Sequence, residues 1–212
     1  MTRDRPVSVL DASDLPTVVF GPRSTLWWGV MGIMTIEGMM FAIMAVSYYY
    51  LRGTAQMWPP SGVVHPGVGI TTLSLAVLLA SMAPAYLAAR AISREDLRGA
   101  RNWFAVTVLF GIAALVLRAM VLDRLTFLWN SHAYGSLIWT TAGLHITHIF
   151  TGTVENILFV ILLHRGPVED KHLLDARLNS FYWYFVALSW VPFYVIFWLD
   201  PALLALRSAA LP

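Results

Sequence analysis

Five long apolar stretches dominate the chain, and short polar segments separate them. The stretches cover residues 25–51, 68–89, 103–122, 136–163 and 181–199. About 20 mostly apolar residues are needed to cross roughly 30 Å of hydrocarbon, where lipid offers backbone groups no hydrogen-bond partners. The pattern therefore predicts an all-α integral membrane bundle of five transmembrane helices. Pro84 and Pro192 are expected to kink the second and the fifth helix.

The remaining segments predict a simple organisation with one membrane unit. Residues 1–24 lack the continuous apolar core of a signal peptide and are interpreted as a polar N-terminal tail. Residues 25–199 form the bundle, and residues 200–212 form a short C-terminal tail. No internal repeat and no soluble domain is evident.

Composition strengthens the membrane interpretation. Hydrophobic residues make up 58% of the chain and charged residues 12%, against roughly 45–50% and about 25% in soluble domains. So few charges do not cover a water-facing surface, which argues against a soluble enzyme, a disordered chain or a nucleic-acid binder. The chain has no cysteine, so disulfides, thiolate metal sites and iron–sulfur clusters are excluded.

The distribution of arginine and lysine predicts the orientation. Five spans place the two termini on opposite sides, and cytoplasmic segments carry the excess of basic residues. Ten basic residues fall on the side of the N-terminus and three on the other. The N-terminus is therefore predicted to be cytoplasmic and the C-terminus outside.

A few ionisable residues lie within the apolar stretches, where an unpaired charge costs at least ~2.5 kcal/mol. Glu37 lies twelve residues into the first stretch, roughly 18 Å deep at about 1.5 Å per residue. We expect its carboxyl group to face the bundle interior and to hydrogen-bond His148 or His145. The alternative is a neutral acid bonded to a backbone carbonyl or a threonine.

The fourth stretch carries its polar residues on one helical face, at spacings of 4, 3, 4 and 3. These residues are Thr141, His145, His148, Gly152 and Glu155. A seam of side chains that hydrogen-bond across helices is the favoured interpretation. A metal site is less favoured, because a second helix supplies one acid and no histidine. A proton relay through the buried acid and these histidines also stays open.

Four arginines invite separate interpretations. Arg118, inside the third stretch, either pairs with a carboxylate or a lipid phosphate within the bundle, or extends its charge to the interface. Three arginines near the predicted cytoplasmic ends are candidates for holding phospholipid headgroups: Arg23, Arg90 and Arg101.

The first stretch carries two closely spaced glycines, and the sequence shows no catalytic motif. Gly29 and Gly32 are expected to allow close packing of a helix or an acyl chain. No nucleophile–base pair, phosphate-binding loop or convincing metal cage is visible. The chain is thus predicted to be a packed, supporting membrane bundle with one buried acid.

Several segments in sequence order resemble subunit III of the haem-copper terminal oxidases, in its short five-helix form. They are Trp28-Gly29-Val30-Met31 with Ile36-Glu37-Gly38, the loop Trp58-Pro59-Pro60-Ser61-Gly62, Ala133-Tyr134-Gly135-Ser136 with Gly143-Leu144-His145-Ile146-Thr147-His148, and Tyr182-Trp183-Tyr184-Phe185-Val186. The resemblance runs from about residue 27 to residue 198. The chain departs from the family pattern at Arg118 in the third stretch and at Tyr184 and Ala187 in the last.

The resemblance implies a non-redox accessory role. Such a subunit docks on oxidase subunit I, within a complex that also has subunit II and uses a cytochrome c or a quinol. Haem and copper lie in the partner subunits, and this chain carries no catalytic residue and no cofactor of its own. The family subunit binds phospholipid and supports sustained proton uptake. One lysine against thirteen arginines is typical of a GC-rich bacterial genome, so a bacterial inner membrane is expected.

Three alternatives stay open at this stage. The chain could be the accessory subunit of a nitric oxide reductase of the same family. It could also be a small proton or cation transporter that uses Glu37 with His145 and His148, although five spans without a repeat argue against most transporters. A membrane enzyme with two metal ions is the third.

Overall fold

A computed structural model describes residues 20–64, 67–166 and 168–201. Within these residues every regular element is a helix: α1 (Thr25–Thr54), α2 (Val68–Ala80), α3 (Met82–Ile92), α4 (Leu97–Asp123), α5 (Ala133–Arg165), α6 (Asp170–Tyr194) and the π-helical η1 (Val195–Leu199). Five units are long and apolar enough to cross a membrane, with α2–α3 and α6–η1 each forming one of them. The predicted all-α bundle of five membrane helices is confirmed. The predicted tails lie mainly outside the described residues.

A proline breaks the second membrane helix where its missing hydrogen bond falls. Pro84 has no N–H for the carbonyl of Ala80, four residues earlier, and α2 ends at Ala80. The chain turns at Ser81 and continues as α3. A residue of α6 stabilises the break, because the indole N–H of Trp183 donates to Ser81 Oγ at 2.8 Å. Pro192 near the end of α6 is followed by the π-helical turn η1.

The fifth helix begins much earlier than the apolar pattern predicts. A start at residue 181 was expected, but α6 starts at Asp170, so the charged segment before residue 181 is helical. At this start the Glu169 backbone N–H donates to His172 Nδ1 at 3.1 Å, which is a local capping interaction. The prediction was wrong here because it took the start of the apolar stretch as the start of the helix. The first turns of α6 are polar and precede that stretch.

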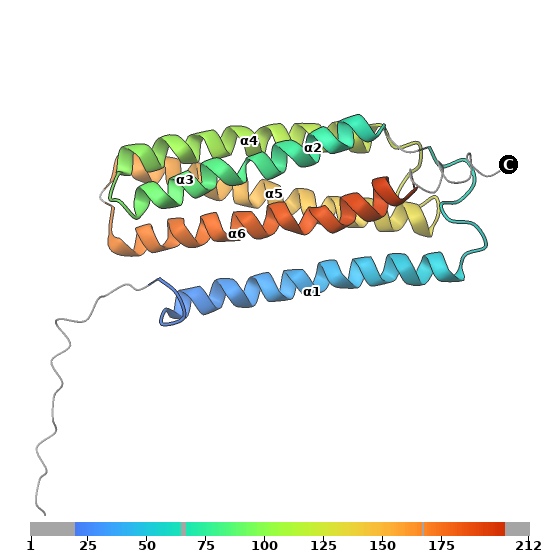
Figure 1. Ribbon diagram of the computed structural model, residues 1–212, viewed down its shortest axis with the longest axis horizontal. Coiled ribbons are helices and arrows are strands. Elements are labelled where there is room, and N and C mark those ends of the chain that lie inside the picture. Colours follow the sequence, from blue (N-terminus) through green and yellow to red (C-terminus); the bar gives the residue numbers. More distant parts are fainter. Residues whose placement is uncertain (1–19, 65–66, 167, 202–212) are drawn as a thin grey trace, which may run out of the picture.

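The helices run side by side along the long axis of the molecule (Figure 1). Helices α2 to α6 pack closely together, whereas α1 lies along one side and contacts mainly α5 and α6. The beginnings of α1, α4 and α6 and the ends of α3 and α5 lie at the same end of the bundle (Figure 1). We call it the basic end, because Arg23, Arg90 and Arg177 are among the cations found there.

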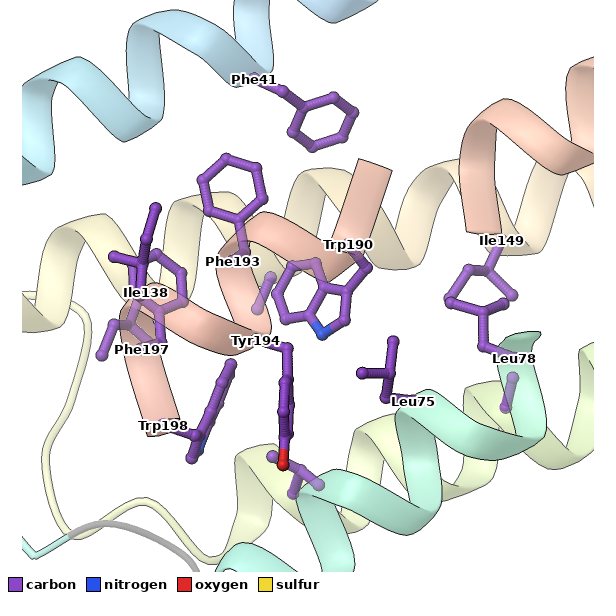
Figure 2. Packing of buried hydrophobic residues seen from close by; sticks show 14 of the residues in the cluster. Phe41, Leu75, Leu78, Ile138, Ile149, Trp190, Phe193, Tyr194, Phe197 and Trp198 are labelled. Atoms are coloured by element: carbon purple, nitrogen blue, oxygen red, sulfur yellow. The ribbon is translucent and has the colours of Figure 1, made fainter. Parts of the chain in front are cut away.

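Aromatic side chains fill the centre of the bundle toward the other end. Figure 2 shows Trp190, Phe193, Phe197 and Trp198 projecting from the last membrane helix into this core. Phe41 joins them from α1, with its ring centroid 5.7 Å from that of Phe193. The core therefore anchors α1 near its middle.

An ion pair joins the far ends of the same two helices. Arg52, in the last turn of α1, donates from Nη1 to Asp200 Oδ2 just after η1. The two side chains are only about one-third exposed. Together with Phe41, this pair holds the C-terminal half of α1 against the last membrane helix.

Close packing occurs at glycines other than the predicted pair. A Cβ on Gly111 would lie 2.4 Å from Thr153 Oγ1, and one on Gly152 would lie 2.9 Å from the Trp183 ring. These contacts join α4 to α5 and α5 to α6. A Cβ built on Gly29 or Gly32 meets no described atom of this chain within 4 Å, so no described helix of this chain packs against that pair.

Candidate functional site

Glu37 lies where α1 meets α5 and α6. Its Oε2 accepts a hydrogen bond from the Tyr182 hydroxyl at 2.8 Å, and its Oε1 lies 3.5 Å from His148 Nε2. The side chains of Glu37 and His148 are 20% and 11% exposed, so both are largely withdrawn from the surroundings. The carboxyl group is thus turned toward the bundle, as predicted, but its shortest hydrogen bond comes from Tyr182. The sequence had not singled out that residue as a partner.

The hydrogen bond on the other ring nitrogen defines what His148 can do. Its Nδ1 lies 2.6 Å from the Leu144 carbonyl oxygen. A carbonyl only accepts, so we assign the proton of this contact to Nδ1. In the neutral ring Nε2 is then an acceptor, and it faces Glu37. Glu37 and His148 therefore match each other when one proton is shared between them, as carboxylic acid with imidazole or as carboxylate with imidazolium.

His145 lies one turn away and has a different environment. Its Nε2 donates to the Val186 carbonyl at 3.0 Å, and its ring lies 4.6 Å from the ring of Trp190. It is completely buried between α5 and α6. Of the two histidines offered as alternative partners for Glu37, His148 lies beside it and His145 does not.

The polar seam of α5 is real but is made partly by residues that the pattern did not include. Asn179 Nδ2 of α6 donates to Asn156 Oδ1 at 3.0 Å, and Asn156 Nδ2 donates to the Gly152 carbonyl at 2.8 Å. Both asparagines are buried. An asparagine next to the predicted Glu155 was the available signal, since buried amides across membrane helices commonly pair.

Three carboxylates from three helices line one groove of about 500 Å³. They are Glu37 of α1, Glu155 of α5 and Asp175 of α6, and Tyr182 and Asn179 lie beside them. Among the residues that the structure describes, no arginine or lysine lines this groove. We call it the acidic groove. It runs along α1 from Leu26 to Glu37, which is roughly 16 Å at about 1.5 Å per residue, so it leads from the basic end toward the middle of the bundle.

Arg118 is buried inside the bundle instead of reaching its edge. Its residue exposure is 2%, and its guanidinium carbon lies 3.8 Å from the ring centroid of Trp190. A cation over an indole face is attracted by the ring quadrupole. In the described part of the chain no carboxylate forms an ion pair with it. The bundle-internal position is thus confirmed and extension to the interface was wrong, while no described carboxylate of this chain provides the expected partner.

The three arginines proposed for lipid headgroups do not form one cluster. Arg90 lines a second groove, between α3 and α6. Arg23 is exposed just before α1, and Arg101 is half-buried on α4. Arg177 of α6, which the sequence reading left out, lines the second groove with Arg90. Among the described residues no group of three His, Asp or Glu side chains could hold a metal ion.

The fold and this geometry define a multi-pass helical membrane protein with a half-buried acid at the junction of three helices. The family model for cytochrome c oxidase subunit III matches residues 17–200. The chain therefore belongs to the cytochrome c oxidase subunit III family.

Curated relatives cover most of the chain. It is 27% identical over 176 residues to cytochrome c oxidase subunit 3 of Thermostichus vulcanus, covering 81% of this chain and 85% of that protein. It is 26% identical over 175 residues to the protein of the same name from Corynebacterium diphtheriae, covering 79% and 84%. The subunit of Struthio camelus is 25% identical over 199 residues, covering 90% and 74%.

Proposed function

We propose that this chain is the non-redox accessory subunit III of a proton-pumping cytochrome c oxidase in a bacterial inner membrane. The observation that carries the proposal is the family match over residues 17–200. It implies partner subunits, which we propose to be subunit I in direct contact, subunit II and a cytochrome c. Haem and copper belong to those partners in this proposal. The relatives are named as cytochrome c oxidase subunits, which favours this complex over a nitric oxide reductase or a separate transporter.

Purification of the intact complex tests the assignment. A tagged chain extracted from its native membrane in mild detergent should retain subunits I and II and a haem absorption spectrum. Deletion of the chain should leave the initial rate of oxygen reduction nearly unchanged, because the redox centres are in other subunits, and should shorten sustained turnover. A tagged chain that purifies without haem-bearing partners would overturn the proposal.

We further propose that the pair of Glu37 and His148 stores one proton for this supporting role. The support is geometric, since the Leu144 carbonyl fixes the proton on Nδ1 and leaves Nε2 facing Glu37 at 3.5 Å. Glu37→Gln keeps the shape and a hydrogen-bond acceptor for Tyr182 but removes the acid. That variant should assemble normally and lose activity faster during prolonged turnover. Unchanged activity over time would contradict the role.

The proposed orientation keeps the N-terminus in the cytoplasm and the C-terminus outside. Ten of the basic residues belong to the side of the N-terminus, and short cytoplasmic loops carry such an excess. Fusion of alkaline phosphatase, which is active outside the cytoplasm, to the C-terminus should give activity. A cytoplasmic reporter that works at the C-terminus would reverse the orientation.

Bound phospholipid is part of the same proposal, with Arg23, Arg90 and Arg101 as headgroup candidates near the basic end. Their positions at helix ends support contact with anionic headgroups.

A further inference from the structure

A second groove, of about 310 Å³, lies between α3 and α6 near the basic end. We call it the basic groove. Arg90 in the last turn of α3 and Arg177 in the second turn of α6 contribute its charges, and none of the described residues that line it is a carboxylate. In the part of the chain that the structure describes, neither arginine forms an ion pair. The groove therefore presents two cations from two helices with no internal counter-ion.

The two guanidinium groups are held differently. Arg90 is exposed at the mouth of the groove. Arg177 is half-buried, and its guanidinium carbon lies 4.2 Å from the ring centroid of Phe20. The aromatic contact restricts the Arg177 side chain and leaves its N–H groups available. A planar guanidinium offers a fork of donors that matches the oxygens of a phosphate.

Polarity changes along the groove in a defined order. Tyr86 lies one turn from Arg90 on α3, and Tyr184 lies two turns from Arg177 on α6. The tyrosines are therefore roughly 6–10 Å deeper in the bundle, at about 1.5 Å per residue. Exposed Leu188 follows one turn beyond Tyr184 on the same helix. Cations, then phenolic hydroxyls, then an aliphatic surface follow the order of phosphate, glycerol esters and acyl chains in a phospholipid.

We propose that the basic groove binds one anionic phospholipid, with its phosphate between Arg90 and Arg177 and its chains along the outer faces of α3 and α6. The inference deepens the proposed function, because it names one site and the headgroup class for the bound phospholipid. It joins Arg90, one of the three candidate arginines, to Arg177 in a single site. A free phosphate ion shares the headgroup chemistry but has no use for the apolar part of the groove.

The test uses the whole oxidase complex and phosphatidylglycerol as the probe. Delipidated complex is titrated with the lipid, and bound lipid is counted by native mass spectrometry. Each basic residue near a membrane surface is worth about 1 kcal/mol to an anionic lipid. The variant Arg90→Gln with Arg177→Gln should therefore bind one phosphatidylglycerol fewer, or bind that molecule about 30-fold more weakly.

Matched controls keep the net charge equal. Arg94→Gln with Arg98→Gln removes two exposed arginines from the same end but outside the groove lining, and it should leave the lipid count unchanged. Arg90→Lys with Arg177→Lys keeps both charges and should recover most of the binding. Inorganic phosphate at millimolar concentration should compete poorly with the lipid.

Four outcomes overturn the inference. They are an unchanged lipid count in the Arg90 and Arg177 double variant, an equal loss in the control, full competition by inorganic phosphate, and release of a partner subunit in place of lipid. The last would make the groove a protein contact. In each case the haem spectrum of the purified complex reports separately on the proposed function, which fails only if haem-bearing partners are absent.

Discussion

The acidic groove and the basic groove lie on two sides of the same helix. Asp175, Asn179 and Tyr182 of α6 face the acidic groove, whereas Arg177 and Tyr184 face the basic one. Asp175 and Arg177 are two residues apart, and two residues rotate a helix by about 200°. The carboxylate of Asp175 and the guanidinium of Arg177 therefore lie on opposite faces of α6.

The charges that line the two grooves suit different occupants. In the described part of the chain the acidic groove has three carboxylates and no cation, which repel an anionic phosphate unless they are protonated, while the basic groove has two arginines and no carboxylate, which attract it. The acidic groove also leads to Glu37 beside His148, whereas the basic groove ends on tyrosines and an apolar surface. Three predictions test this contrast and one tests how the C-terminal end of α1 is held, from the largest expected effect to the smallest.

Glu37→Leu should remove the polar contacts at the inner end of the acidic groove. It leaves the Tyr182 hydroxyl and His148 Nε2 without their partner, and an unsatisfied buried polar group costs about 1–3 kcal/mol. The thermal midpoint of the purified complex should fall clearly, and α1 should become more sensitive to protease. Glu37→Gln is the matched control and should stay close to the unmodified chain. Equal stability of both variants would show that the hydrogen bonds contribute nothing.

Tyr182→Phe should have a smaller effect on the same site. It removes the 2.8 Å hydrogen bond to Glu37 and keeps the ring, so a loss of about 1 kcal/mol is expected. Tyr184→Phe, on the opposite side of α6, has no such bond to Glu37 and should leave the stability nearly unchanged. Thermal unfolding of the two complexes distinguishes the faces, and equal shifts would remove the contrast.

The ion pair of Arg52 with Asp200 should contribute less. Both side chains are about one-third exposed, and solvent screens such pairs to about 0–1 kcal/mol. A double-mutant cycle with Arg52→Gln and Asp200→Asn measures the coupling. A coupling well above this range would mean that charge contributes more to fixing the C-terminal end of α1 than the exposure of the two side chains predicts.

The smallest expected effect is on how well the complex retains anionic phospholipid when the acidic groove loses negative charge. Glu155→Gln with Asp175→Asn removes two charges from the acidic groove without changing side-chain size. Retention of phosphatidylglycerol by the complex should then rise modestly, while retention of phosphatidylethanolamine should change little. A fall in bound phosphatidylglycerol would contradict the assignment of headgroups by charge.

The sequence predicted some features of the candidate site because they are local. Position along an apolar stretch placed Glu37 near the middle of the first membrane helix, and helical spacing placed His145 and His148 toward the bundle interior. The partner of Glu37 was harder to predict, because Tyr182 is 145 residues away in the chain. Helix packing brings that hydroxyl to Glu37, and no period within one helix reports it.

Arg118 shows a choice that the sequence left open. A cation near a helix end either pairs within the bundle or extends its long side chain to water at the interface. Here the residue is buried, and the face of Trp190 lies 3.8 Å from the guanidinium carbon. Whether an arginine near a helix end is buried depends on what packs above it, which hydropathy along one segment does not contain.

The number and type of the membrane helices followed from the sequence alone, because apolar length is local and lipid forces such segments to be helical. The break before Pro84 followed for the same reason, since a proline lacks its N–H in every context. Only the tertiary structure decided which glycines meet a neighbour, that Tyr182 holds Glu37, and that Arg90 joins Arg177 across two helices. These features depend on the rotation and register of packed helices, and that geometry is set by contacts between residues far apart in the chain.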